Sequence, residues 1–78
     1  MDNLLITLRA ARINRGLKLK DVAKYCSKSI DTIIKYEKDS TDIPRDLMIA
    51  LLELYQIRGD NIFFGRESDF IGKINRLA

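Results

Sequence analysis

The hydrophobic positions of residues 19–38 form two short groups, each with the periodicity of a helix. The first group follows the i, i+3, i+4, i+7 spacing that places side chains on one helical face: Leu19, Val22, Ala23 and Cys26. Ile33 and Tyr36 continue the helical spacing in the second group. The hydroxyl of Ser29 can accept an unpaired backbone N–H of this second helix. The pattern therefore predicts two short helices, joined by a tight break at Ser27-Lys28.

A further helix is predicted before this pair. Asp2 or Asn3 can cap its N-terminus, and Gly16 supplies the left-handed residue after its end at Arg15. Its buried stripe is predicted to be Leu5, Leu8 and Ala11, and its solvent side to carry Arg9, Arg12 and Arg15.

A fourth helix is predicted to open at Pro44, a residue that is tolerated in the first turn. Its core stripe has helical spacing: Met48, Leu51, Leu52 and Tyr55. Its remaining sides are also largely apolar, because they carry Leu47, Ile49, Ala50 and Leu54. A helix that is hydrophobic all round is normally buried all round. In a domain this small, we expect its second face to contact another subunit.

The last third of the chain contains a break at residues 56–59, followed by a predicted short helix at Asp60–Phe64 that Gly65 ends. Ile62 and Phe63 are expected to reach back to the core, and Phe64 to add apolar surface near the fourth helix. In residues 66–78, apolar residues recur at near-helical spacing: Phe70, Ile71, Ile74 and Leu77. A loose C-terminal helix and an arm that completes a dimer are equal alternatives for this stretch.

Length and composition restrict the class of protein. Seventy-eight residues make one domain at most, and 46% hydrophobic with 32% charged residues is typical of a soluble helical domain rather than a disordered chain. No apolar run approaches the roughly 18–20 residues of a membrane span, and no signal-peptide pattern opens the chain. We therefore expect a cytoplasmic protein without a membrane partner.

The chain lacks the side chains that most catalytic sites require. It has one cysteine and no histidine, which excludes an internal disulfide, a Cys/His zinc set and a Ser-His or Cys-His nucleophile. Cys26 is interpreted as a small core residue, and Asp42 and Asp46 as parts of a loop and a helix start. We therefore expect no enzyme activity, no metal, no cofactor and no small-molecule substrate.

Charge divides the chain into two halves. Residues 1–38 carry nine basic and four acidic side chains, whereas residues 39–78 carry five basic and seven acidic ones. A basic half of this kind suits a phosphate-facing surface, although charge runs are also common on solvated helix faces. Two short helices, a tight turn and lysines around the break together indicate a helix-turn-helix.

An ordered set of residues resembles the Cro/phage-repressor-type helix-turn-helix family, also called XRE or lambda-repressor-like. The set consists of Gly16-Leu17, Val22-Ala23, Ser29, Thr32-Ile33 and Tyr36-Glu37, with Pro44 and Ile57 downstream. The resemblance covers residues 4–64. It implies an all-α, five-helix DNA-binding domain over residues 1–65, with a C-terminal extension at 66–78.

The resemblance also implies a function. It suggests a sequence-specific DNA-binding transcriptional regulator of the Cro or repressor kind, of phage or mobile-element type. Such a protein acts as a homodimer on an operator with two half-sites in double-stranded DNA. The alternative is a protein-interaction module, such as an anti-repressor, that uses the exposed Ile30 and Ile34. One of these isoleucines can instead tuck under the edge of the core.

The family pattern implies the following site residues. Base contacts are expected from Ser29, Ile30, Asp31, Ile34 and Lys35. Contacts to the DNA backbone are expected from Lys18, Leu19, Lys20, Lys28, Lys38, Ser40 and Thr41. A dimer interface is expected from Leu47, Leu54, Phe64, Phe70, Ile71 and Ile74. One of the arginines of the first helix is expected to reach a phosphate or to pair with Glu37, and a surface arginine without a role is an equal alternative.

The chain departs from the family pattern at the start of the second helix. Lys18 stands where the family favours a Ser or Thr cap, and Leu19 replaces a glutamine that touches the DNA backbone. Lys20 can supply that contact as a point charge, and the N-terminus of the helix itself also attracts anions.

Overall fold

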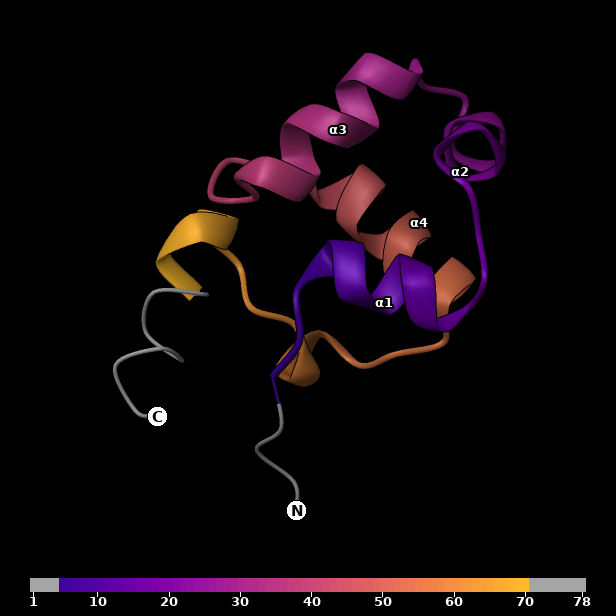
Figure 1. Ribbon diagram of the computed structural model, residues 1–78. Helices are drawn as coiled ribbons and strands as arrows, with labels where there is room; N and C mark the ends of the chain where they lie inside the picture. Colours follow the sequence, from indigo (N-terminus) through magenta and orange to yellow (C-terminus); the bar gives the residue numbers. More distant parts are fainter. Residues whose placement is uncertain (1–4, 71–78) are drawn as a thin grey trace.

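The computed structural model describes residues 5–70, which form four α-helices and one turn of 3₁₀-helix (Figure 1). The elements are α1 (Leu8–Asn14), α2 (Leu19–Cys26), α3 (Ile30–Lys38), α4 (Arg45–Tyr55) and η1 (Gly59–Asn61). Residues 67–70 form a further helical turn. Within residues 5–70, β-type pairing is limited to two isolated bridges. The predicted all-α fold class is confirmed.

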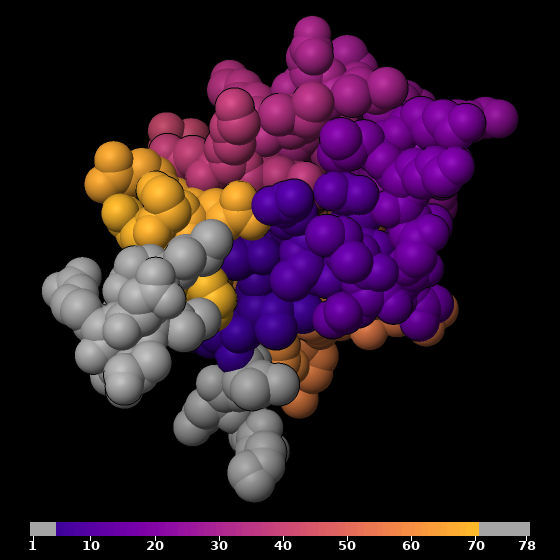
Figure 2. Space-filling model, in the orientation of Figure 1, coloured from indigo at the N-terminus to yellow at the C-terminus, as the bar shows by residue number. Residues whose placement is uncertain are grey.

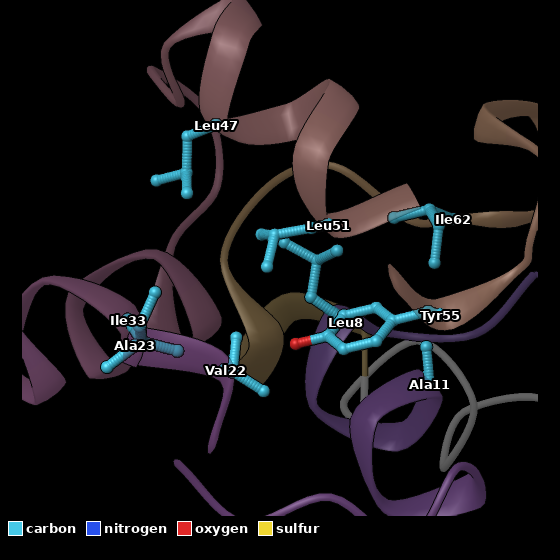
Figure 3. Close-up of a cluster of buried hydrophobic side chains, with 9 residues drawn as sticks. All are labelled: Leu8, Ala11, Val22, Ala23, Ile33, Leu47, Leu51, Tyr55 and Ile62. Atoms are coloured by element: carbon cyan, nitrogen blue, oxygen red, sulfur yellow. The ribbon is translucent and has the colours of Figure 1, made fainter. Parts of the chain in front are cut away.

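One hydrophobic core joins all four helices to the segment after η1 (Figure 3). Its members are Leu8, Ala11, Val22, Ala23, Ile33, Leu47, Leu51, Tyr55 and Ile62. Val22 of α2 and Ile33 of α3 are the most completely buried large side chains. Burial of such a side chain stabilises the fold by about 1.5–3 kcal/mol. The predicted inward faces of α2 and α3 therefore meet, and α2 also packs against α4.

Leu47 corrects the interpretation of α4. Its side chain is only 2% exposed, because it packs into the domain's own core. The expectation that Leu47 lies in a dimer interface is therefore wrong. The outer side of α4 instead carries the exposed Ile49 and the half-buried Leu54.

The turn between α2 and α3 has the predicted geometry. Ser27 ends α2 with a left-handed backbone, and Ser29 caps α3 by accepting the Thr32 N–H at 3.1 Å. Lys18 caps α2 without a side-chain acceptor, since an ammonium group can only donate. The carboxylate of Asp21 accepts the Lys18 backbone N–H at 3.1 Å, which supplies one half of a capping box.

The N-terminus of α1 differs from the prediction. The helix begins at Leu8, and the Thr7 hydroxyl caps it by accepting the Ala10 N–H at 3.0 Å. Residues 5–7 are not helical, because Ile6 pairs in parallel with Ile62 in a β-bridge. Leu5 is therefore 42% exposed instead of belonging to the buried stripe. The suggested cap residues 2 and 3 lie outside the described residues, whereas the predicted end at Gly16 is confirmed by its φ of 70°.

The predicted short helix at residues 60–64 is present as the 3₁₀ turn η1, but it ends earlier than predicted. A single 3₁₀ turn, η1, is followed by an extended segment at residues 62–66. The Phe63 N–H donates to the Ile6 carbonyl at 2.9 Å, and the Ile6 N–H donates to the Asn61 carbonyl at 2.9 Å. These backbone groups are satisfied by a distant segment, so a helix is not needed to pair them. Ile62 is buried in the core as expected.

Ser40 joins the loop after α3 to the extended segment through hydrogen bonds. Its N–H donates to the Gly65 carbonyl at 3.0 Å, and its hydroxyl accepts the Gly65 N–H at 3.0 Å. Only 3% of Ser40 is exposed. The expectation that Ser40 contacts the DNA backbone is therefore wrong, because its polar groups are committed within the domain.

An ion pair at the edge of the core joins α1 to α3. The Arg12 Nε lies 2.6 Å from Glu37 Oε2, and its Nη2 donates to Oε1 at 3.3 Å. The third nitrogen, Nη1, donates to the Leu17 carbonyl at 3.0 Å. The side chains of Arg12 and Glu37 are only 12% and 9% exposed, and their hydrogen bond raises the pKa of Arg12. Of the alternatives for the arginines of the first helix, pairing with Glu37 describes Arg12, which does not face the solvent as predicted.

The hydroxyl of Tyr55 is buried and has no hydrogen-bond partner among residues 5–70. Figure 3 shows the ring crossing the core with its oxygen directed toward Val22. Burial raises the pKa of Tyr55, and the negative charge of Glu37 raises it further. A buried hydroxyl without a partner destabilises the folded state.

No helix within residues 5–70 has the length and apolar content to cross a membrane.

The Arg12–Glu37 pair gives the first prediction. We expect Glu37→Gln to lower the free energy of unfolding by about 3 kcal/mol, because it leaves a poorly solvated guanidinium without its counter-charge. Replacing both residues with methionine should restore most of that loss. Asp60→Asn is the control, since its pair with Arg58 is exposed and worth at most about 0.5 kcal/mol. Equal losses for Glu37→Gln and Asp60→Asn in urea unfolding would contradict the prediction.

Tyr55→Phe removes the unpaired hydroxyl, and we expect it to raise the free energy of unfolding by about 1 kcal/mol. The raised pKa adds a pH dependence. The unfolded chain loses its phenolic proton first, so stability is full below about pH 10 and falls as pH rises above it. In Tyr55→Phe, this decrease in the free energy of unfolding at high pH should be absent. Tyr25→Phe, at an exposed tyrosine, should change neither quantity. A less stable Tyr55→Phe variant would contradict the assignment.

Candidate nucleic-acid interface

The N-terminal part of α3 forms an exposed surface. Its cap and first turn carry Ser29, Ile30 and Asp31, and Lys35 follows one turn later; all four side chains are exposed. Ile33 holds the opposite face of α3 in the core. Figure 1 shows α3 along one edge of the molecule, on the far side of α4 from η1. The structure thus brings these four predicted base-contacting residues together on one free helix face.

The two isoleucines of α3 differ in exposure. Ile30 is 42% exposed, whereas Ile34 is half-buried and lines a cleft toward α1 and α2. Of the alternatives for these residues, tucking under the core edge describes Ile34. Ile30 is therefore the principal apolar group of the exposed face.

Lysines surround this face. Lys18 and Lys20 lie at the start of α2, Lys28 in the turn, and Lys38 at the end of α3; all are exposed. Lys35 lies over the Tyr36 ring, with its Nζ 5.1 Å from the ring centroid. Among residues 5–70, the ion pairs involve Arg12, Arg58 and Arg66 but none of these lysines. Their ammonium groups are therefore available to an anionic partner.

The remaining predicted backbone contacts are less available than these lysines. Leu19, the first residue of α2, is half-buried against the core. Thr41 is exposed, but its N–H and hydroxyl donate to Asp39 Oδ1 at 3.0 and 2.6 Å. These two hydrogen bonds lower the pKa of Asp39. The donors of Thr41 are thus committed to the turn after α3.

A cleft of about 230 Å³ lies beside the exposed face of α3. It is lined by Arg9, Arg12, Leu19, Ile34, Glu37, Lys38 and Glu67. Glu67 was not among the predicted site residues, and Arg9 was predicted only as one of the first-helix arginines that could reach a phosphate. The sequence gives a signal for Arg9, because this residue lies one helical turn before Arg12. Glu67 has no such signal, because its position depends on the pairing of distant backbone segments.

Two features of residues 5–70 bear on metal and thiol chemistry. Residues 5–70 contain no group of three side chains that could hold a metal ion. The only cysteine, Cys26, is half-buried, and burial raises the pKa of its thiol. A raised pKa leaves little thiolate near neutral pH and makes the sulfur a poor nucleophile.

The predicted dimer residues lie in the C-terminal half of the sequence, and those that the structure describes are exposed to different degrees. Leu54 is half-buried and Phe64 is 36% exposed. Phe70 is half-buried and packs on Phe63, with ring centroids 4.9 Å apart. Residues 71 and 74 lie outside the described residues. Arg66 and Asp39 form an antiparallel backbone bridge, so the start of the predicted extension contacts the domain.

Comparison with known proteins identifies the family. A family model described as helix-turn-helix, HTH_3, matches residues 8–61, which is more than half of the chain. A search of curated proteins finds no match. The match spans all four α-helices and η1, and includes the exposed face of α3 with its surrounding lysines. The chain belongs to the HTH_3 helix-turn-helix family, the XRE or lambda-repressor-like group of DNA-binding regulators.

Proposed function

We propose that the protein is a sequence-specific transcriptional regulator that inserts α3 into the major groove of duplex DNA. One observation carries the proposal: the exposed N-terminal face of α3 is surrounded by lysines that have no carboxylate partner within residues 5–70. An α-helix fits the major groove, where base edges carry a distinct pattern of donors and acceptors. The family assignment supports DNA binding by this motif.

The side chains on α3 suit different base edges. Lys35 can donate to O6 or N7 of guanine, and Ile30 can contact a thymine methyl group. Asp31 can accept from N4 of cytosine, and the Ser29 hydroxyl can reach either a base or a phosphate. Ile34 is half-buried, so its contribution is confined to the edge of the contact. In this scheme α3 supplies the discrimination between sequences.

The lysines around α3 supply the affinity that does not depend on sequence. Lys18 and Lys20 lie at the N-terminus of α2, where the helix dipole also favours a phosphate. Lys28 and Lys38 flank α3 at its two ends. Each phosphate that a lysine neutralises releases counterions, so binding should weaken steeply with salt.

We further propose that two copies bind an operator with two half-sites. Recognition helices about 34 Å apart would then meet successive major grooves on one face of the duplex. Ile49, Leu54 and Phe64 provide apolar surface for such a dimer. Regulation would follow from occupancy, since bound protein blocks or recruits polymerase. A phage or mobile-element origin and a cytoplasmic location belong to the same proposal.

A protein-interaction module is the second candidate. The exposure of Ile30 favours it, because an apolar side chain on a free helix face suits a protein partner. The two candidates differ in their response to salt, since contact through Ile30 does not depend on phosphate charge.

A charge-reversal experiment tests DNA binding. Anisotropy titrations of labelled duplexes from around the protein's own gene should give an affinity that falls steeply with salt, with a log–log slope near about −4. Lys28→Glu and Lys35→Glu should each weaken binding by more than about tenfold without changing thermal unfolding. Arg58→Glu is the matched control, because Arg58 is exposed and lies before η1, away from α3. Unchanged binding by both lysine variants, or a slope near zero, would refute the docking surface.

The dimer has its own test. Sedimentation equilibrium should report about twice the chain mass of 9.0 kDa. Phe64→Asp should shift the equilibrium toward monomer, because it places a charge in the proposed apolar contact. Ile13→Asp is the control at an exposed apolar residue of α1 outside that contact. A wild-type monomer at micromolar concentration, or equal effects of the two variants, would contradict the proposed interface.

A further inference from the structure

We propose that the carboxylate of Glu67 competes with a DNA phosphate for the cleft beside α3 and so lowers the affinity for DNA. The inference rests on the proposed function and adds an acidic side chain from beyond the family match, which ends at residue 61. Glu67 is half-buried and lines the cleft together with two cations, Arg9 and Lys38.

Within residues 5–70, some of the charged side chains in the cleft are paired with each other, and others are not. Arg12 and Glu37 neutralise each other through their ion pair, and the third guanidinium nitrogen of Arg12 is held by the Leu17 carbonyl. Arg9 and Lys38 are exposed and form no ion pair within residues 5–70. The positive potential of the cleft therefore comes from these two side chains, and Glu67 is the acidic group that opposes it.

Backbone pairing explains why Glu67 reaches the cleft. Asp39 and Arg66 form an antiparallel bridge, and in such a pair the preceding residue of one segment faces the following residue of the other. Lys38 and Glu67 are those two neighbours. The bonds between Ser40 and Gly65 hold the same register from the other side.

Side-chain contacts then hold the turn that carries Glu67. Arg66 pairs with Asp69 at 3.0 Å, and Phe63 packs on Phe70. In Figure 2, the atoms of this turn, in yellow, lie between α1 and the end of α3. Glu67 is therefore positioned by contacts of the folded domain.

The cleft adjoins the surface that would meet DNA. Leu19 is the first residue of α2, Lys38 is the last residue of α3, and both line it. A DNA backbone that passes these two helix ends brings a phosphate to Arg9 and Lys38. At that position the Glu67 carboxylate repels the phosphate and lowers the positive potential of the two cations. DNA must therefore displace Glu67 or bind less tightly.

Substitution of Glu67 in the full chain tests the inference. The probe is a fluorescein-labelled random-sequence duplex, because phosphate contacts do not depend on sequence. At about 50 mM salt we expect Glu67→Gln to bind about five- to tenfold more tightly than wild type. The slope of log affinity against log salt should also become steeper, by up to about 0.9. Glu67→Lys, which inserts a cation, should gain more.

Two controls separate this effect from a general change in charge. Asp60→Asn removes the same charge at an exposed site in η1, away from α3, and should change affinity by less than about twofold. In an Arg9→Gln/Lys38→Gln background, Glu67→Gln should give no gain, because the cations it opposes are absent. Thermal unfolding of each variant checks that the fold is intact.

The outcomes also separate this inference from the proposed function. A wild-type protein that binds no duplex at low salt would refute DNA binding itself. If wild type binds and Glu67→Gln and Glu67→Lys bind equally or more weakly, the competition by Glu67 is refuted while DNA binding stands. A gain that Asp60→Asn reproduces would also overturn the inference.

Discussion

The ion pair between Arg12 and Glu37 is the constraint on which the placement of α3 depends. It is the polar link between α1 and α3 at the edge of the core, and the same guanidinium also holds the Leu17 carbonyl in the corner before α2. Charged groups with so little exposure are costly to separate, so the three segments must keep a fixed relation. Hydrophobic contact through Ile33 can hold α3 against the core, but the planar, two-point geometry of the pair fixes its orientation.

A second constraint is the extended segment at residues 62–66, which contacts two distant parts of the chain. Ile62 pairs with Ile6 ahead of α1, and Arg66 pairs with Asp39 after α3. This segment directly follows η1, the fifth helix of the domain, and covers residues where the short helix was predicted to continue. It also aligns the C-terminal turn with the cleft, so the same backbone hydrogen bonds that complete the fold set the charge beside the proposed DNA surface.

The sequence pattern predicted the parts of the structure that depend on local interactions. The caps and turns at Gly16, Ser27 and Ser29, and the inward faces marked by Val22 and Ile33, follow from residue type and spacing. The errors share a different cause. The exposure of Leu5, the burial of Ser40 and the early end of the helix at residues 60–64 depend on isolated β-bridges. These bridges pair segments far apart in the chain and leave no periodic pattern in the sequence.

The candidate site divides in the same way. Lys28, Lys35 and their neighbours could be predicted, because exposed lysines around a short helix pair are visible in the sequence. The half-burial of Ile34 and the position of Glu67 could not, since each depends on how α1 and the C-terminal turn close over the end of α3. Leu47 was misassigned because apolar residues surround α4, and periodicity does not show which side of such a helix the domain itself covers.

The parallel bridge between Ile6 and Ile62 has a consequence for biosynthesis. During translation, the region before α1 has no pairing partner until residues 61–63 have left the ribosome. Contacts between residues so far apart in sequence are the slow ones to form, because the intervening loop must close first. The helix pair at residues 19–38 can associate early, whereas the pairing that fixes the segment before α1 awaits the synthesis of Ile62.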